Sequence, residues 1–410
     1  MVACATMKCL VCMTAMLGML LSGVAKAAVP AHFSDAAKEL LADSVQLEAS
    51  ENKLNVIYFL GTDAEVVPDY ERRLSELLLY VQQFYGKEME RNGFGRRSFG
   101  LEMKENGEVE ILVIRGKKKA AEYGYDKGPQ VTLDEVAEYF KAHPEKKRSH
   151  HSFIIMPTFY NEQYNDKNPG GVPFYGFGVN CFALDYVGFD IKHFGKNTPE
   201  GRLLTKWYGG FTHELGHGLN LPHNNGPASM NAQLGEPLMR AGNYTFGLKP
   251  TYLTPASCAV LDRSETFAVA GDKTNFYSDG MPLPEVIEAK VRYEDDALKL
   301  DFLCRGVFTN INVYLQDPPY AVNEDYEAVA FRAAVGEDRG DGFRPVSVTI
   351  PKAEISELRS DKRRLDLYFI SVNGNRARWN MEFKWSEAEK GNSTKLLSAS
   401  LFETAAIRLI

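Results

Sequence analysis

The order of apolar and polar residues divides the first part of the chain into strand and helix patterns in alternation. Residues 28–50 predict only a short helical lead, and the apolar run from Leu54 to Leu60 then predicts a buried strand. After Pro68-Asp69, apolar residues recur every three or four positions from Leu74 to Tyr85, which predicts a helix with one buried face. The run from Ser152 to Met156 predicts a second buried strand.

Shorter signals predict three more elements in this part of the chain. Asn106-Gly107 separates two alternating runs, residues 98–103 and 109–114, and this arrangement predicts a hairpin. Thr132-Leu133-Asp134-Glu135 has the form of a capping box and predicts the start of a helix. Thr254-Pro255 predicts another, shorter helix.

A longer helix is predicted from residue 198 onward. Thr198 is a favourable N-cap, and Pro199 fits the first helical position. Gly209-Gly210 lowers the helix propensity and therefore predicts close packing against another element. The apolar stripe of this helix consists of Leu204, Tyr208, Phe211 and Leu215.

The pattern changes to strands near residue 285. Asn373-Gly374 predicts a hairpin, and a small β-sandwich is the natural architecture for such a segment. The Gly/Pro-rich residues 280–284 resemble a domain boundary. We therefore predict one unit over residues 28–280 and an accessory β-sandwich over residues 285–410. The strand-like runs are Ala297–Leu303, Asn312–Leu315, Val346–Ile350, Leu365–Ser371 and Ala377–Trp385.

The N-terminal residues predict export. Residues 1–27 contain Lys8, an apolar run and Ala25-Lys26-Ala27, which together have the form of a signal peptide cleaved after Ala27. We expect a secreted or periplasmic protein with no membrane insertion after cleavage. The formal charge of −7 becomes more negative when the two lysines are removed, which argues against nucleic acid and anionic membranes as partners.

Three cysteines remain after the predicted cleavage. Cys181 and Cys258 are the better candidates for a disulfide, and Cys304 would then be left over. Buried free thiols are an equally good interpretation of all three.

The segment from His213 to His223, HELGHGLNLPH, contains the candidate chemistry. His213 and His217 are four residues apart, so in a helix they face one metal ion with Glu214 beside them. His223 reaches the same ion only if the chain bends back, and Gly218, Asn220 and Pro222 allow such a bend. With 8 histidines in 410 residues, HExxH alone arises by chance in roughly one such chain in a hundred. The third histidine makes chance much less plausible.

The segment resembles HExxHxxGxxH, the extended zinc signature of the metzincin metallopeptidases, with Asn220 at the position of the signature's glycine. The resemblance implies that His213, His217 and His223 bind Zn²⁺ and that Glu214 is the general base. It also implies a methionine turn beneath the metal, for which Met239 is the candidate and Met230 a poorer one. Many metzincins have a tyrosine two residues after this methionine, where this chain has Ala241 and the next tyrosine is Tyr244.

The same resemblance implies an α+β, metzincin-like catalytic domain followed by the all-β sandwich domain. The glycine-rich residues 170–178 then occupy the place of an edge strand that binds extended substrate, although a surface loop explains them equally well. Glu236 is an alternative third ligand, as in zinc peptidases of the glutamate type. We also expect a fragment that ends near residue 280 to retain its zinc.

Two functions follow from these observations. The first is a secreted zinc metalloendopeptidase, a hydrolase acting on a protein or peptide substrate. The alternative is an extracellular binding or adhesion protein with a non-catalytic zinc site. Glu214 favours the first, because a purely structural site gains nothing from a general base and tends to fill all four coordination positions.

Overall fold

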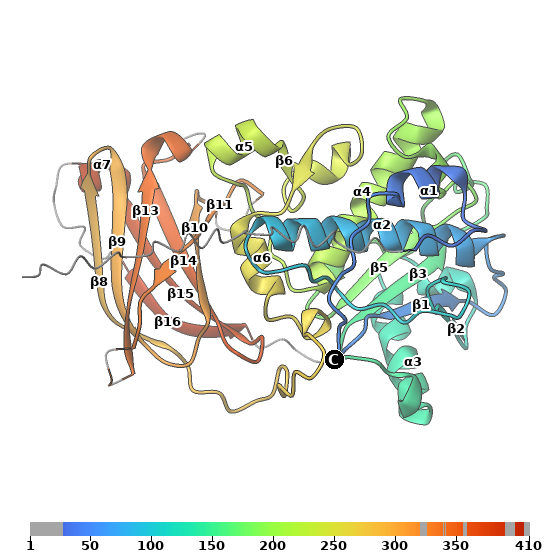
Figure 1. Cartoon of the computed structure of the whole chain (residues 1–410), viewed down its shortest axis with the longest axis horizontal. Coiled ribbons are helices and arrows are strands. Elements are labelled where there is room, and N and C mark those ends of the chain that lie inside the picture. The colour runs from blue at the N-terminus through green and yellow to red at the C-terminus, as the bar shows by residue number, and fades with distance from the viewer. Residues whose placement is uncertain are drawn as a thin grey trace, which may run out of the picture.

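The computed structural model describes residues 28–319, 326–338, 340, 342–355 and 359–389, together with the backbone of residues 398–405. The predicted signal peptide lies outside these ranges. An α+β unit and an all-β unit lie next to each other (Figure 1), which confirms the predicted fold class. Within the described ranges, no helix has both the length and the apolar character needed to cross a bilayer.

The α+β unit is built on a mixed five-stranded sheet. Its strands are β1 (Asn55–Leu60), β2 (Leu112–Arg115), β3 (Ser152–Pro157), β4 (Gly176–Phe177) and β5 (Asn180–Asp185). They lie in the order β2-β1-β3-β5-β4. The first four are parallel, and β4 is an antiparallel edge strand. The segment 170–178 thus supplies an edge strand, although only two of its residues pair.

Six α-helices belong to this unit, and α2 and α4 pack against each other across the core. These helices are α1 (Asp35–Leu41), α2 (Tyr70–Arg91), α3 (Gly128–Ala142), α4 (Pro199–Gly218), α5 (Ala228–Leu234) and α6 (Pro255–Leu261). The hydroxyl groups of Tyr85 and Tyr208 each donate to a carbonyl of the other helix. In Figure 1, α2 and α4 lie on one side of the strands and α3 on the other.

Several short elements connect these helices and strands. They are the strands β6 (Glu236–Pro237) and β7 (Thr251–Tyr252) and the 3-10 turns η1 (Ala120–Tyr123), η2 (Pro144–Lys146), η3 (Ile191–His193), η4 (Gly242–Thr245) and η5 (Glu265–Phe267).

Of two local signals before residue 150, the first is confirmed and the second is misplaced. Asn106-Gly107 forms the turn of a short hairpin, in which Met103 and Val109 make an antiparallel bridge and the Glu110 N–H donates to the Glu102 carbonyl. Beyond this short pairing, the second run continues into β2, which pairs in parallel with β1. The predicted capping box lies inside α3. That helix begins at Gly128 with Pro129 in its first turn, and the Thr132 hydroxyl donates to the Gly128 carbonyl.

The all-β unit is a sandwich of two antiparallel sheets, in the orders β11-β10-β14-β15-β16 and β12-β13-β9-β8. Its apolar core lies between the sheets and includes Trp379 and Trp385. Its elements are β8 (Glu285–Glu294), β9 (Ala297–Arg305), β10 (Asn310–Gln316), β11 (Val329–Arg332), β12 (Ala334–Val335), β13 (Phe343–Pro351), η6 (Lys352–Glu354), β14 (Lys362–Ile370), β15 (Arg376–Lys384), α7 (Trp385–Glu389) and β16 (Ser398–Ala405).

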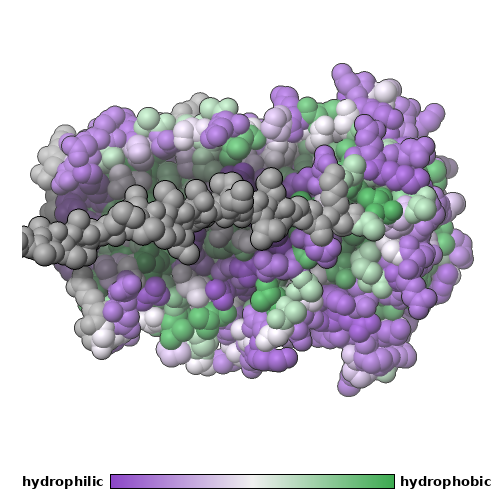
Figure 2. Space-filling view, viewed as in Figure 1, coloured by the Kyte–Doolittle hydropathy of each residue, from purple (hydrophilic) through white to green (hydrophobic). Residues whose placement is uncertain are grey.

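The two units contact each other through polar and apolar groups. The Asn312 side chain donates to the Ala256 carbonyl of α6 at 2.8 Å, and Ala256 also belongs to a small buried cluster with Ala328 and Tyr368 of the sandwich. Hydrophilic residues dominate the visible surface at the end of the molecule that carries α1 and α3, whereas hydrophobic patches are more frequent near the middle (Figure 2).

Candidate active site

The helix α4 carries the first part of the site and ends as its sequence requires. The Thr198 hydroxyl accepts from the Gly201 N–H, and Pro199 occupies the first turn. At the other end, Asn220 adopts φ of 69°, the left-handed conformation that turns the chain back. Gly218 is needed for a different reason, because a Cβ there would lie 2.6 Å from the Cys181 Sγ.

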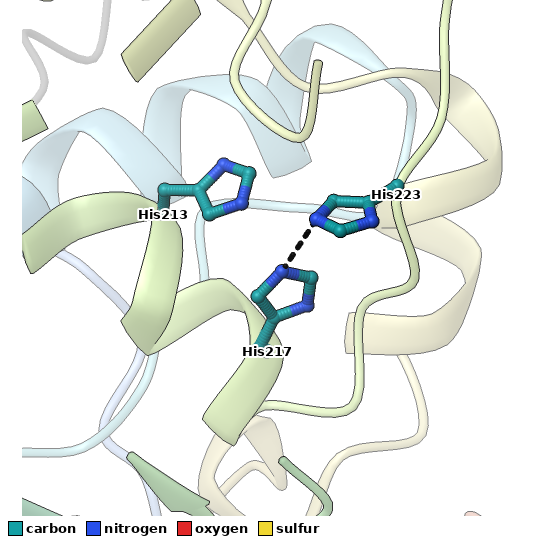
Figure 3. Close-up of side chains that lie close together, drawn as sticks. All are labelled: His213, His217 and His223. Carbon is teal, nitrogen blue, oxygen red and sulfur yellow. Dashed lines mark hydrogen bonds between the residues drawn. The ribbon is translucent and has the colours of Figure 1, made fainter. Parts of the chain in front are cut away.

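Three histidine side chains converge at this turn. His213 and His217 project from α4, and His223 approaches from the following loop (Figure 3). Within the described ranges, one ring nitrogen from each lies within 4.8 Å of the others. The Nε2 atoms of His217 and His223 are 3.0 Å apart. The sequence-predicted ligand set is therefore assembled in one place.

Backbone carbonyls orient the two helical histidines. The Nδ1 of His213 donates to the Leu238 carbonyl, and the Nδ1 of His217 donates to the Leu221 carbonyl, both at 2.8 Å. Each neutral ring therefore directs an unprotonated Nε2 into the cluster. The His223 Nε2 lies beside the inward-facing Nε2 of His217, so the three rings offer nitrogen ligands to one point. The donor set fits a zinc ion.

A buried polar network holds the loop that carries His223. The Asn224 amide donates to the Pro222 carbonyl and to the Ser257 hydroxyl, both at 3.1 Å. Its oxygen accepts from the Thr254 hydroxyl at 2.8 Å. Thr254 also caps α6, so the start of that helix fixes the position of the third histidine.

Glu214 lies on α4 beside the cluster and contacts the edge strand. Its Oε2 accepts from the Gly176 N–H at 2.9 Å. Burial raises the pKa of Glu214 to about 7, and the hydrogen bond from Gly176 partly opposes this shift. A carboxylate so placed is suited to accept a proton near neutral pH.

Met239 packs against α4 next to the histidine-bearing turn. A Cβ added at Gly216 of α4 would be 2.6 Å from the Met239 Sδ, so the methionine packs directly against the helix. Met239 follows Leu238, whose carbonyl orients His213. The rival ligand Glu236 is instead paired with Arg240 at 2.8 Å and does not belong to the histidine cluster.

Tyr326 is a site residue that the sequence did not reveal. Its ring stacks on His223 with 3.7 Å between centroids and 26° between planes. It comes from the all-β unit, far along the chain, and no motif marks it. Tyr244, the tyrosine that follows Met239 in the sequence, is 66% exposed. Burial, and then the nearby Tyr244 and Glu214, raise the pKa of Tyr326.

The structure also supplies elements that the sequence analysis overlooked. The strand β5, between β4 and α4, was not predicted, although Asn180–Asp185 is a mostly apolar run.

The three cysteines outside the predicted signal are buried free thiols. Burial raises the pKa of each, which makes the thiols unreactive. Of the two interpretations from the sequence, buried free thiols are therefore correct, and the disulfide between Cys181 and Cys258 is not formed.

Gly176 must remain a glycine for the edge strand to reach Glu214. A Cβ there would lie 2.2 Å from the Glu214 carbonyl oxygen and 2.7 Å from the His217 Cβ. We expect Gly176→Ala to displace β4 and reduce turnover of a peptide substrate by about 10²-fold, as a 1 Å misplacement can do.

The matched control for Gly176 is Gly178→Ala. Its added Cβ meets no atom within 4 Å, although φ is +58°, so this change should cost only about 1–2 kcal/mol of backbone strain. Equal turnover of the two variants would show that β4 does not need its close approach to α4.

His151 closes the C-terminal end of α4. Its Nδ1 donates to the Gly218 carbonyl at 2.8 Å, and the Tyr277 hydroxyl donates to its Nε2 at 2.6 Å. The Tyr277 oxygen in turn accepts from the Glu265 N–H. Burial lowers the pKa of His151 to about 4, so the folded protein holds the neutral ring.

This shift predicts a loss of stability in acid. Between pH ~6.5 and ~4 the unfolded chain takes up a proton at His151 that the folded chain does not, so stability falls as pH falls. The contribution of His151 approaches about 1.4 kcal/mol per pH unit. Denaturant unfolding at several pH values should show a shallower dependence for His151→Gln, whereas His143→Gln, at a half-exposed position, is the control. An identical dependence in His151→Gln and wild type would contradict the prediction.

Neither a protein-family profile nor a curated protein sequence matches this chain. Crystal structures of OgpA from Akkermansia muciniphila are similar to it. Wild-type OgpA in space group P 41 21 2 is 48% identical, with a TM-score of 0.81, and the match covers 88% of this chain and 99% of OgpA. Wild-type OgpA in P 21 21 21 is 49% identical, with a TM-score of 0.79 and coverage of 85% and 96%.

A third similar structure contains a bound substrate. It is catalytically inactive OgpA in complex with an O-glycopeptide, glycodrosocin. It is 49% identical to this chain, with a TM-score of 0.81, and the match covers 85% of this chain and 97% of that protein. Coverage of this extent includes residues of both the α+β unit and the sandwich.

Proposed function

This chain belongs to the OgpA family, and on that basis we propose that it is an exported, zinc-dependent endopeptidase that cleaves O-glycosylated polypeptides. One observation carries the proposal. His213, His217 and His223 converge next to Glu214 in a family with a member that takes an O-glycopeptide as substrate. The resemblance of residues 213–223 to the metzincin zinc signature and the packing of Met239 against α4 support the same chemistry.

The histidines would hold the metal through their inward-facing nitrogens, with the Nδ1 atoms of His213 and His217 retained by backbone carbonyls. A bound zinc ion would supply a Lewis acid that activates water and polarises the scissile carbonyl. Glu214 accepts a proton from the attacking water and returns it to the leaving amine. The Gly176 N–H keeps the Glu214 carboxylate directed along the edge strand.

The edge strand β4 would bind the peptide. It is the last strand of the sheet, so one of its edges pairs with no other strand of that sheet. The backbone groups on this edge can pair with an extended peptide, as in β-strand addition. Because Gly176 contacts Glu214, a peptide paired with β4 passes beside the proposed general base.

Aromatic rings flank this strand and suit a glycan. Tyr125 is 55% exposed and contacts Tyr175 with 5.7 Å between centroids. Tyr175 also contacts Phe177 at 5.9 Å. An apolar ring face with a polar hydroxyl at its edge can pack on a sugar and bond its hydroxyl groups. These rings are therefore the proposed glycan contacts.

The test uses one peptide in two forms, with and without a single O-linked glycan. We expect cleavage of the glycosylated form, loss of cleavage after removal of metal with a chelator, and recovery with Zn²⁺, all followed by mass spectrometry. Equal cleavage of both forms would refute the glycan requirement. Binding of the glycopeptide without cleavage would instead support a binding protein with a non-catalytic metal site.

A further inference from the structure

The β-sandwich contributes directly to the histidine cluster through Tyr326. The tyrosine ring lies 3.7 Å from the His223 ring, nearly parallel to it, and 6.2 Å from the His213 ring. His223 is the one cluster residue that lies on a loop rather than on α4. It is also half-buried, whereas His213 and His217 are buried. Tyr326 therefore covers the one histidine of the cluster that α4 does not carry.

Backbone pairing brings Tyr326 to this position. The Asn225 N–H donates to the Ala328 carbonyl at 2.7 Å, and the Ala330 N–H donates to the Asn225 carbonyl at 2.9 Å. Asn225 and Val329 thus form a parallel bridge between the units. Since Asn225 comes two residues after His223, and Ala328 comes two residues after Tyr326, the pairing sets the register of the two rings.

An ion pair connects the same segment to the turn that carries Met239. The Arg240 guanidinium contacts both carboxylate oxygens of Glu327, with Nη2 2.8 Å from Oε1 and Nε 3.1 Å from Oε2. Arg240 follows Met239, and Glu327 follows Tyr326. A paired Arg–carboxylate geometry restrains orientation as well as distance. The loop of His223 and the turn of Met239 are consequently both connected to one segment of the sandwich.

We infer that Tyr326 is a positioning residue of the active site, which fixes the ring of His223 for metal binding, and that the sandwich is needed to complete the site. This inference rests on the proposed function. It reverses the expectation that a fragment ending near residue 280 retains its zinc, because that fragment lacks Tyr326, Glu327 and the strand that pairs with Asn225. The sandwich is then a structural part of the catalytic centre.

The experiment compares full-length Tyr326→Ala and Tyr326→Phe with wild type. Zinc affinity is measured by competition with a chromophoric chelator, and kcat and KM are measured separately. Loss of a residue that orients a metal ligand typically costs 10–100-fold in affinity or activity, so we expect Tyr326→Ala to bind zinc about 10-fold more weakly. Its kcat should fall, with KM within about twofold of wild type. Tyr326→Phe retains the ring and should restore both values.

The ion pair is tested by Glu327→Gln, with Asp301→Asn as the matched control. Asp301 pairs with Arg292 within the sandwich, so its loss should leave the zinc affinity unchanged, whereas Glu327→Gln should weaken it in the same direction as Tyr326→Ala. Unchanged zinc affinity and kcat in Tyr326→Ala would overturn the inference, as would failure of Tyr326→Phe to restore them. Absence of stoichiometric zinc from wild type would overturn the proposed function, and this inference with it.

Discussion

Replacing Glu214 with glutamine should abolish most hydrolysis while leaving zinc binding and folding unchanged. The amide has almost the same shape as the carboxylate but cannot accept a proton from water. The rate should therefore fall by at least the roughly 10²–10⁴-fold that a removed general base costs. The measurements are kcat/KM on the O-glycopeptide, zinc content and thermal unfolding of the purified variant.

Glu200→Gln is the control for this change, because Glu200 is an exposed glutamate in the first turn of the same helix. It should retain the turnover of wild type. Retained turnover in Glu214→Gln would instead remove Glu214 from the mechanism, and loss of zinc from that variant would mean that the carboxylate has a structural role.

Replacing His223 with alanine should eliminate stoichiometric zinc binding and, with it, peptide hydrolysis. Two imidazoles on one helix would remain, which is one ligand fewer than catalytic zinc sites use. Metal analysis after dialysis is the direct measurement, and a fall of at least 10²-fold in zinc affinity is the expected scale for a lost ligand, beyond that of an outer-shell partner.

Glu236→Ala distinguishes the two possible third ligands. Glu236 is paired with Arg240 in the structure, so its loss should leave the zinc content near that of wild type. If Glu236→Ala loses zinc and His223→Ala keeps it, the site is of the glutamate type and the assignment of His223 as a ligand is wrong.

Local sequence determined the elements in which one signal dominates. Thr198, Pro199 and an apolar stripe predicted α4, and the cap and the first turn follow from those side chains alone. The spacing of His213 and His217 places them on one face of any α-helix, whatever surrounds it. Asn220 predicted the reversal after α4, because few other residues accept a left-handed conformation.

The alternating runs after residue 285 also predicted a sandwich, since strand periodicity is a local property. By contrast, local signals did not fix where every element begins and ends. The run after Asn106-Gly107 closed a short hairpin but then continued into β2, which pairs with β1 in parallel, and Pro129 started α3 before the apparent capping box.

Only the tertiary structure decided which distant segments meet at the site. The Gly176 N–H reaches Glu214 because β4 packs against α4 without an intervening Cβ. Tyr326 reaches His223 because Asn225 pairs with a strand of the sandwich. Neither contact leaves a periodic or spaced pattern in the sequence, since each depends on how two separately folded surfaces pack. The sequence by itself therefore determined the candidate ligands and the proposed base, and the packing of the two units determined what surrounds and orients them.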